Sequence, residues 1–330
     1  MNHSAGTHVI FGSGPLGLAV MRELVRREKE VRVVNRSGKI AGSESLPVGV
    51  EVIAADAYQP ENTRRVCAGA VVVYQCAQPA YMDWVEKFPA LQASILMGAG
   101  ANGARLIVGE NLYMYGEVVG PIHEELPYQA KTKKGQVRAQ MAERVLEAHA
   151  QHKVQAAIGR GSDFYGPHVL GSSLGDRFFG ALLQGKTASL VGRLDQPHTY
   201  TYIDDFGKAL VMLGEREEAL GGVWHVPNPP TLTQGELARL AFQTAGLSPK
   251  FNRMGRLMMT IGGLFIPEAR ETVEMLYEFE RPFIVDSSKF IQAFGDIATP
   301  HKVGLQQTLT WYQQYLIREH KLADQGIAIG

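Results

Sequence analysis

Residues 8–38, which read HVIFGSGPLGLAVMRELVRREKEVRVVNRSG, decide the fold of this chain. A short β-branched run leads into a glycine-rich turn, which is followed by apolar residues at helical spacing, Leu16, Val20 and Leu24. A second β-branched run comes near the end of the stretch. The order strand, helix, strand predicts a βαβ unit, and therefore an α/β fold with a parallel sheet.

The turn after the first predicted strand carries Gly12, Gly14 and Gly17 in the spacing G-x-G-x-x-G. In this place the three glycines serve the tight turn, the close approach of the backbone to a pyrophosphate, and the packing of helix on strand. The free amides and the dipole at the start of the helix also favour an anion. We therefore predict a dinucleotide site, against the alternative of a glycine turn without a ligand. The same turn contributes Ser13, Pro15 and Leu16.

The end of the second predicted strand indicates which dinucleotide is bound. A NAD site usually has an Asp or Glu there, about 20 residues after the glycines, to bind the ribose 2′-hydroxyl. This chain has Asn35, Arg36 and Ser37, with Lys39 close by. A carboxylate would repel a 2′-phosphate, whereas an arginine can hold it with two parallel hydrogen bonds. NADP(H) is therefore the predicted cofactor and NAD(H) the second possibility, while Arg36 as a solvated loop cation is the alternative.

Two later loops fit the same site, because the carboxyl ends of parallel strands meet at one edge of a sheet. After the third predicted strand, Asp56 and Ala57 are expected beside the adenine. After the fourth, the loop QCAQP is expected beneath the nicotinamide ribose. Its predicted contacts are Cys76, Ala77 and Gln78.

The remaining sequence predicts a doubly wound parallel sheet followed by a looser, mostly helical part. Strand-like and helix-like runs alternate up to about residue 166, with helices expected at 15–28, 84–97 and 135–149. We expect a dinucleotide-binding domain over 1–166 and a smaller substrate lobe over 167–330, with a segment near 199–226 returning to the first domain. In the second half, helices are expected near 172–185, 205–214, 233–245, 268–279 and 305–320, and strands at TYTYI and GVWHV.

The composition narrows the class of protein. The 330 residues contain 33 Lys and Arg and 33 Asp and Glu, so charge gives no reason to expect a nucleic acid or a membrane partner. With two cysteines, the chain has no disulfide framework. The N-terminus lacks the pattern of a signal peptide, and no apolar run is long enough to span a bilayer. We expect a cytoplasmic protein with a small-molecule substrate. The ten histidines do not cluster at ligand spacing, so no metal is expected.

Five further segments, taken with GSGPLG, carry a resemblance to a known family. They are NLYMYG (111–116), PIHEELPY (121–128), RGSDFYGP (160–167), YTYIDDFGKAL (200–210) and VWHVPNPPTLT (223–233). In order and spacing the chain resembles the extended short-chain dehydrogenase/reductase superfamily, in its NAD(P)-dependent epimerase/dehydratase-like group. The resemblance implies a Rossmann domain, a C-terminal substrate lobe and a possible homodimer.

The resemblance also marks three catalytic positions at which this chain differs. Members of the family usually use a Ser or Thr, with a Tyr and a Lys spaced Tyr-x-x-x-Lys on one helix. Counted from the Tyr115–Gly116 turn, these positions hold Asn111, Lys134 and Arg138. Arg138 can still donate to ribose hydroxyls, but it is permanently charged and cannot supply a proton. Lys134 can do so only if burial and the neighbouring Arg138 favour its neutral form.

The missing tyrosine leaves the proton donor open. Reduction of a carbonyl needs a donor for the forming alkoxide. Tyr113, Tyr115 and Tyr165 are the candidate phenols, with Asn111 holding the substrate oxygen as a neutral donor. The alternative is that these tyrosines only pack and anchor their hydroxyls.

These observations predict an NADP(H)-dependent oxidoreductase that acts on a small carbonyl or hydroxyl compound. A sugar-type epimerase or dehydratase that keeps its cofactor bound is the second hypothesis. A third, from a different class, is an NADP(H)-sensing or scaffold protein without turnover, which the substitutions at 134 and 138 favour.

Overall fold

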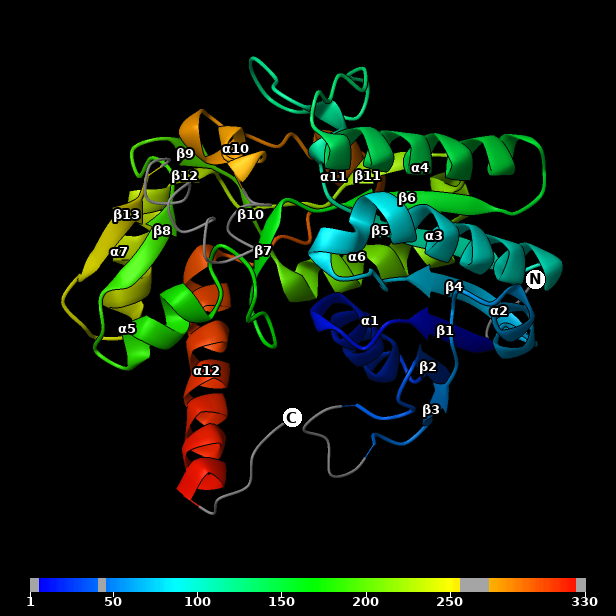
Figure 1. The fold of residues 1–330 in the computed structure, drawn as a ribbon, viewed down its shortest axis with the longest axis horizontal. Coiled ribbons are helices and arrows are strands. Elements are labelled where there is room, and N and C mark those ends of the chain that lie inside the picture. Colours follow the sequence, from blue (N-terminus) through cyan, green and yellow to red (C-terminus); the bar gives the residue numbers. More distant parts are fainter. Residues whose placement is uncertain (1–5, 41–45, 256–272, 325–330) are drawn as a thin grey trace. The chain divides into compact units, whose positions relative to one another are not determined.

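The structure is a computed structural model that describes residues 6–40, 46–255 and 273–324 (Figure 1). It divides into two compact units. The first contains residues 1–162, 204–227 and 285–297, and the second contains residues 163–203, 228–284 and 298–330. Among the described residues, no helix combines the length and the apolar character that crossing a bilayer requires.

The first unit is built on a seven-stranded sheet in which all strands are parallel. The order is β11-β6-β5-β4-β1-β2-β3, which reverses direction between β1 and β4. Such a reversal opens a crevice at the carboxyl ends of the two strands. The strands are β1 (Thr7–Phe11), β2 (Val31–Asn35), β3 (Val50–Ala54), β4 (Ala70–Gln75), β5 (Arg105–Glu110), β6 (Ala156–Arg160) and β11 (Val223–His225).

Helices cover both faces of this sheet, and each face has its own apolar core. On one face α2 (Pro60–Val66), α3 (Trp84–Ala101) and α4 (Lys133–Ala150) pack over residues such as Val73 and Val108. On the other face lie α1 (Pro15–Arg26), α6 (Ile203–Glu215) and α11 (Ser288–Phe294). Figure 1 shows α3 and α4 on one side of the sheet and α1 on the other. Three short 3-10 helices complete the unit, η1 (Tyr81–Asp83), η2 (Tyr113–Tyr115) and η4 (Glu217–Ala219).

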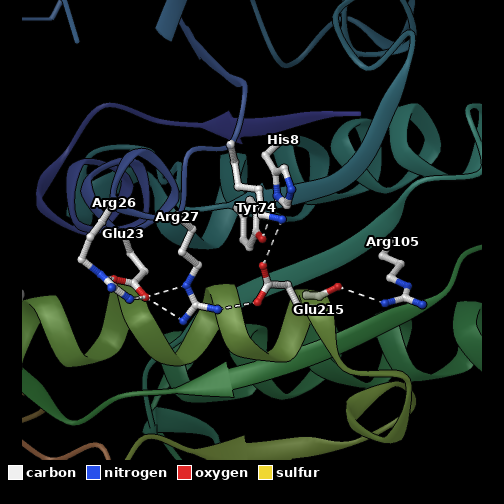
Figure 2. Close-up of polar contacts among 9 residues, drawn as sticks. His8, Glu23, Arg26, Arg27, Tyr74, Arg105 and Glu215 are labelled. Atoms are coloured by element: carbon white, nitrogen blue, oxygen red, sulfur yellow. Dashed lines mark hydrogen bonds and ion pairs between the residues drawn. The ribbon is translucent and has the colours of Figure 1, made fainter. Parts of the chain in front are cut away.

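An ion-pair network ties the end of α1 to the end of α6, on the far side of the unit from the glycine turn. Figure 2 shows Arg27, the residue that follows α1, reaching both Glu23 of that helix and Glu215 of α6. Arg27 Nη2 lies 2.6 Å from Glu23 Oε1. Beside this network the His8 ring stacks on Tyr74, with His8 Nδ1 3.2 Å from the Tyr74 hydroxyl. Arg26, in the last turn of α1, also complements the helix dipole. The ion pair of Arg27 with Glu215 links the ends of the two helices.

The second unit has a separate core, which includes Phe178, Phe179, Tyr202, Phe242 and Leu309. Its strands form three two-stranded sheets, β7 (Asp163–Tyr165) with β10 (Tyr200–Tyr202), β8 (Ala188–Val191) with β13 (Phe251–Met254), and β9 (Pro197–His198) with β12 (Leu232–Thr233). Among its described residues, the helices are a π-helical turn η3 (Asp176–Gly180), α5 (Ala181–Leu183), α7 (Gln234–Thr244), α10 (Tyr277–Glu280) and α12 (His301–Asp324).

The predicted α/β fold with a parallel sheet is confirmed, and most of the expected helices are present. The helix expected at 172–185 is wrong in its extent, since only a π-helical turn and the three-residue α5 form there. A Cβ on Gly175 would lie 2.0 Å from the Leu170 carbonyl oxygen, so this segment folds back as a turn before the helix begins. TYTYI forms a strand that pairs with β7 of the second unit. Residues 268–272 of the helix expected at 268–279 lie outside the described residues.

Candidate functional site

The glycine turn has the geometry that its spacing predicts. Gly12 has φ +101°, and a Cβ there would lie 2.8 Å from the backbone of Ala77. A Cβ on Gly17 would lie 2.0 Å from the Gly12 carbonyl oxygen, so this glycine allows α1 to pack against the turn. No described atom lies within 4 Å of a Cβ built on Gly14. The turn is therefore closed behind Gly12 and Gly17 and open in front of Gly14, which is the cradle that a pyrophosphate needs.

The start of α1 leaves this cradle ready for an anion. Gly14 is the N-cap, Pro15 is the first residue, and no side chain caps the helix. Its first turn contains no acidic residue. Uncapped amides at a helix start together with the helix dipole attract phosphate. Since Gly12 after β1 and Ala77 after β4 meet where the strand order reverses, the residues present fit a dinucleotide.

The loop after β2 is organised by Asn35. Its Nδ2 donates to Ser13 Oγ at 2.8 Å and to the Lys39 carbonyl at 2.8 Å, and its Oδ1 accepts from Gly38 N at 2.7 Å. Asn35 thus joins the loop to the glycine turn. Arg36 and Ser37, the side chains predicted to meet a 2′-phosphate, are both exposed.

The loops after β3 and β4 close the same edge of the sheet. Asp56 Oδ1 accepts from Tyr58 N at 3.0 Å, so its carboxylate shapes the turn that leads to α2, beside Ala57. Cys76 N donates to Phe11 O at 3.0 Å. Burial raises the pKa of the Cys76 thiol well above its usual value, and the thiol stays protonated. Ala77 lies against Gly12, and Gln78 is exposed.

Asn111 and Tyr113 lie together just beyond the end of β5. Asn111 Oδ1 accepts from Tyr113 N at 3.4 Å, and both side chains are partly exposed. With its oxygen held by the backbone, the Asn111 amide presents its NH2 group elsewhere, as a neutral hydrogen-bond donor.

Tyr115, in contrast, is buried in a polar network, with only 1% of its surface exposed. Its hydroxyl lies 2.6 Å from Arg160 Nη1 and 2.9 Å from His225 Nε2. His225 Nδ1 faces the Asp286 carbonyl at 2.9 Å and must donate to it, so in neutral His225 the Nε2 accepts the Tyr115 proton. Burial raises the pKa of Tyr115 to about 12 and lowers that of His225 to about 3. The Tyr115 hydroxyl is therefore an anchor.

The third candidate phenol belongs to the second unit. Tyr165 is fully buried there, and its ring stacks against Phe179 at 6.3 Å between centroids and tilts against Tyr202 at 5.5 Å. The structure therefore does not group the three tyrosines in one unit, and of Tyr113 and Tyr115 it leaves only Tyr113 partly exposed.

The two cations of α4 meet groups of the protein itself. Arg138 is 2% exposed, and its Nη2 lies 3.5 Å from Glu110 Oε1. Its guanidinium covers the rings of Phe88 at 4.7 Å and Trp84 at 5.7 Å. Burial is the largest cause that lowers the pKa of Arg138, which Glu110 opposes. Within the described part of the chain, Nε and Nη1 of Arg138 have no hydrogen-bond partner.

The sequence analysis did not identify three further side chains of this region, those of Glu110, Tyr81 and Trp84. Glu110 accepts from Arg160 Nε at 3.2 Å as well as pairing with Arg138, so one buried carboxylate serves two buried arginines. The Tyr81 hydroxyl donates to the Tyr113 hydroxyl at 3.4 Å, and Lys134 Nζ lies 4.6 Å from the Tyr81 ring centroid. Trp84 packs against the rings of Tyr81 and Tyr113. Only the place of Tyr81 and Trp84 shortly after the β4 loop could have suggested them.

Metal binding has no candidate centre in the described ranges, where no three His, Cys, Asp or Glu side chains are grouped to hold an ion. The open glycine cradle, the uncapped α1 and the parallel sheet define a dinucleotide-binding α/β protein. The chain belongs to the NAD dependent epimerase/dehydratase family, whose model matches residues 9–226. The resemblance noted from the sequence motifs is thereby confirmed.

Individual relatives are distant in sequence. A dTDP-glucose 4,6-dehydratase from Streptomyces griseus is 25% identical over 200 residues, which are 59% of this chain and 52% of that enzyme. The chain thus spans about half the length of this relative.

Solved structures of the same fold match nearly the whole chain. A UDP-N-acetylglucosamine 4-epimerase from Methanobrevibacter ruminantium superposes with a TM-score of 0.78 at 15% identity, covering 94% of this chain and 99% of that one. A dTDP-glucose 4,6-dehydratase from Streptomyces venezuelae, solved with NAD bound, gives 0.76 at 17% identity, covering 93% and 97%. At these identities the likeness establishes the fold.

Proposed function

We propose that this protein is an NADP(H)-dependent oxidoreductase acting on a small carbonyl or hydroxyl compound. The observation that carries the proposal is the open space at Gly14 on an uncapped helix, beside a β2 loop that has Arg36 and no carboxylate over residues 35–39. When bound, the nicotinamide would supply or accept the hydride. Gly12, Gly14 and Gly17 would hold the pyrophosphate, and Arg36 the 2′-phosphate.

The chain's own groups then have separate roles. Asn111, whose amide oxygen faces the backbone, would donate from its NH2 group to the substrate oxygen. Tyr113 would supply the proton, because the Tyr115 hydroxyl is committed to Arg160 and His225. Arg138 would contribute a fixed positive charge beside the ribose, held by Glu110.

Hydride transfer from deuterated NADPH to a panel of small aldehydes and ketones tests the proposal. We expect stereospecific loss of label together with alcohol formation. Tight NADPH binding without any exchange across the panel would refute the oxidoreductase and favour a nucleotide sensor, which the burial of Lys134 and Arg138 among the protein's own groups also supports.

An epimerase or dehydratase acting on a sugar-type substrate is the second candidate. The relatives favour it, since the enzymes named above carry out these reactions on nucleotide sugars by their printed names. In that case the nucleotide would copurify with the protein and would not be consumed. Product formation from a nucleotide sugar without net NADPH oxidation would therefore replace our first proposal.

A further inference from the structure

Two phenols that lie 32 residues apart in the chain meet beside a buried cation. The Tyr81 hydroxyl donates to the Tyr113 hydroxyl, with 3.4 Å between the oxygens. The ammonium of Lys134 lies over the Tyr81 ring, 4.6 Å from its centroid. Both tyrosines are partly exposed, whereas Lys134 is 2% exposed. The two tyrosines are therefore open to a ligand to an extent that the lysine is not.

Residues from four elements hold this pair in place. Tyr81 lies in η1 after β4, and Tyr113 in η2 after β5, and these strands are neighbours in the sheet. Trp84 contacts both rings, edge-on to Tyr81 at 5.0 Å and tilted to Tyr113 at 5.9 Å. Lys134 comes from the first turn of α4. The contact between the hydroxyls is thus a product of packing and not of a flexible surface.

We propose that Tyr81 and Tyr113 form a proton-transfer pair, in which Tyr113 protonates the substrate oxygen and Tyr81 returns a proton to Tyr113. The inference rests on the proposed oxidoreductase function. It makes Tyr81 a further catalytic residue and gives Lys134 a positioning and electrostatic role beside it.

The step balances in protons and charge. The Tyr113 O–H bond breaks as a new O–H bond forms on the alkoxide that develops when hydride reaches the carbonyl carbon. The proton of the Tyr81 hydroxyl then passes along the hydrogen bond to the Tyr113 oxygen. The negative charge comes to rest on Tyr81, next to the Lys134 ammonium, until a water molecule of the solvent reprotonates it.

The length of the hydrogen bond agrees with this role. A separation of 3.4 Å exceeds the usual 2.7–2.8 Å between hydroxyl oxygens, but catalytic hydrogen bonds are often long without substrate and shorten in the complex. Tyr115 does not compete as donor, because its burial and its bonds to Arg160 and His225 withhold its proton from a ligand.

The test uses Tyr81→Phe, which keeps the ring beneath Lys134 and removes only the hydroxyl. Tyr113→Phe removes the proposed donor, and Tyr315→Phe, at a partly exposed tyrosine of the second unit, is the matched control. The first readout is NMR of protein labelled with ¹³C at the tyrosine Cζ, recorded against pH on the full chain, which needs no substrate. The second is turnover of NADPH with the carbonyl panel.

In the NMR titration we expect the Tyr113 signal to ionise at higher pH in Tyr81→Phe than in wild type, and to be unchanged in Tyr315→Phe. Lys134→Met should also shift the ionisation of the Tyr113 signal to higher pH. In turnover, Tyr113→Phe should lower kcat by about a thousandfold and Tyr81→Phe by about ten- to a hundredfold, within the range of general acid catalysis. NADPH affinity should change less than about twofold in the three tyrosine variants.

The outcomes separate this inference from the proposed function. If wild type shows no turnover but the Tyr113 titration depends on Tyr81, the pair exists and the proposed reaction is wrong. If wild type turns over and Tyr81→Phe matches it in both kcat and the titration of Tyr113, the proton-transfer pair is refuted and Tyr81 only packs.

Discussion

The carboxylate of Glu110 lies between two buried arginines, accepting from Arg160 Nε at 3.2 Å and meeting Arg138 Nη2 at 3.5 Å. All three side chains are at most 3% exposed. Glu110 ends β5 and directly precedes Asn111, and Arg160 ends β6, its register partner. One negative charge therefore compensates two positive charges next to the candidate site. Both arginines depend on Glu110 for this compensation.

Removal of this charge should be costly. We expect Glu110→Gln to lower the free energy of unfolding by about 3–5 kcal/mol, because it leaves two buried guanidinium groups without an anion. Urea denaturation of wild type and variant measures the difference. The double variant Glu110→Gln, Arg138→Met should regain part of the loss, since one buried cation is then gone. A loss under about 1 kcal/mol in the single variant would show that the pair contributes little.

Two glycines of the turn should respond differently to the same added methyl group. Gly14→Ala meets open space, so we expect it to cost about 1 kcal/mol or less in stability but to weaken NADPH binding at least about tenfold. Gly17→Ala would place Cβ 2.0 Å from the Gly12 oxygen and should destabilise the fold by about 1–3 kcal/mol or more. Thermal unfolding and NADPH fluorescence measure the two effects. Unchanged NADPH affinity in Gly14→Ala would remove the pyrophosphate from this turn.

Cofactor choice should depend on Arg36. We expect Arg36→Ala to weaken NADPH binding by about 1–3 kcal/mol, the size of a charge-assisted hydrogen bond, and to leave NADH nearly unchanged. Titration calorimetry with both nucleotides measures this. Lys186→Ala, which removes an exposed cation from the second unit, controls for the general loss of charge. Equal weakening of both nucleotides would contradict an Arg36 contact with the 2′-phosphate.

Acid should destabilise the first unit through two buried histidines. Burial lowers the pKa of His8 to about 4 and that of His225 to about 3, from an ordinary value near 6.5. Well above pH 6.5 both histidines are neutral in the folded and in the unfolded state. Their titration then makes no contribution to the free energy of unfolding. As pH falls below 6.5 the unfolded chain takes up protons that the fold excludes, so stability declines until the folded pKa is reached. Each group contributes up to about 1.4 kcal/mol per pH unit.

Urea denaturation at pH 7, 6, 5 and 4.5 measures this decline. In His8→Gln the free energy of unfolding should fall less steeply with decreasing pH, because the contribution of one of the two histidines is gone. His152→Asn, at an exposed residue with φ 56° where asparagine is tolerated, should leave the decline as in wild type. A decline in His8→Gln as steep as in wild type would show that His8 is not excluded from protonation.

The glycine turn and the β2 loop could be predicted from the sequence because their information is local. Gly12, Gly14 and Gly17 lie within six residues, and their backbone requirements follow from their own spacing. Asn35 ends the second strand of the same βαβ unit. The sheet followed from the alternation of strands and helices, while the short helices of the second unit did not, since glycines such as Gly175 break a pattern that is otherwise helical.

The surroundings of α4 could not be predicted, since their partners come from distant parts of the chain. The sequence placed Arg138 on a predicted helix, at the position where the resemblance expects a lysine. It did not indicate that Glu110, Trp84 and Phe88 would contact this arginine. The hydroxyl of Tyr115 was likewise a candidate proton donor until Arg160 and His225, 45 and 110 residues away, were found to engage it.

Short-range spacing thus specified the dinucleotide cradle and the α/β architecture, because backbone conformation and hydrophobic periodicity are properties of neighbouring residues. Which tyrosine hydroxyl is engaged by the protein itself, and which charge balances each buried cation, is decided only by the folded chain, which brings Glu110, Arg160, His225 and Tyr81 to their partners. Desolvation and hydrogen bonding depend on distances in space, and those distances exist only in the packed protein.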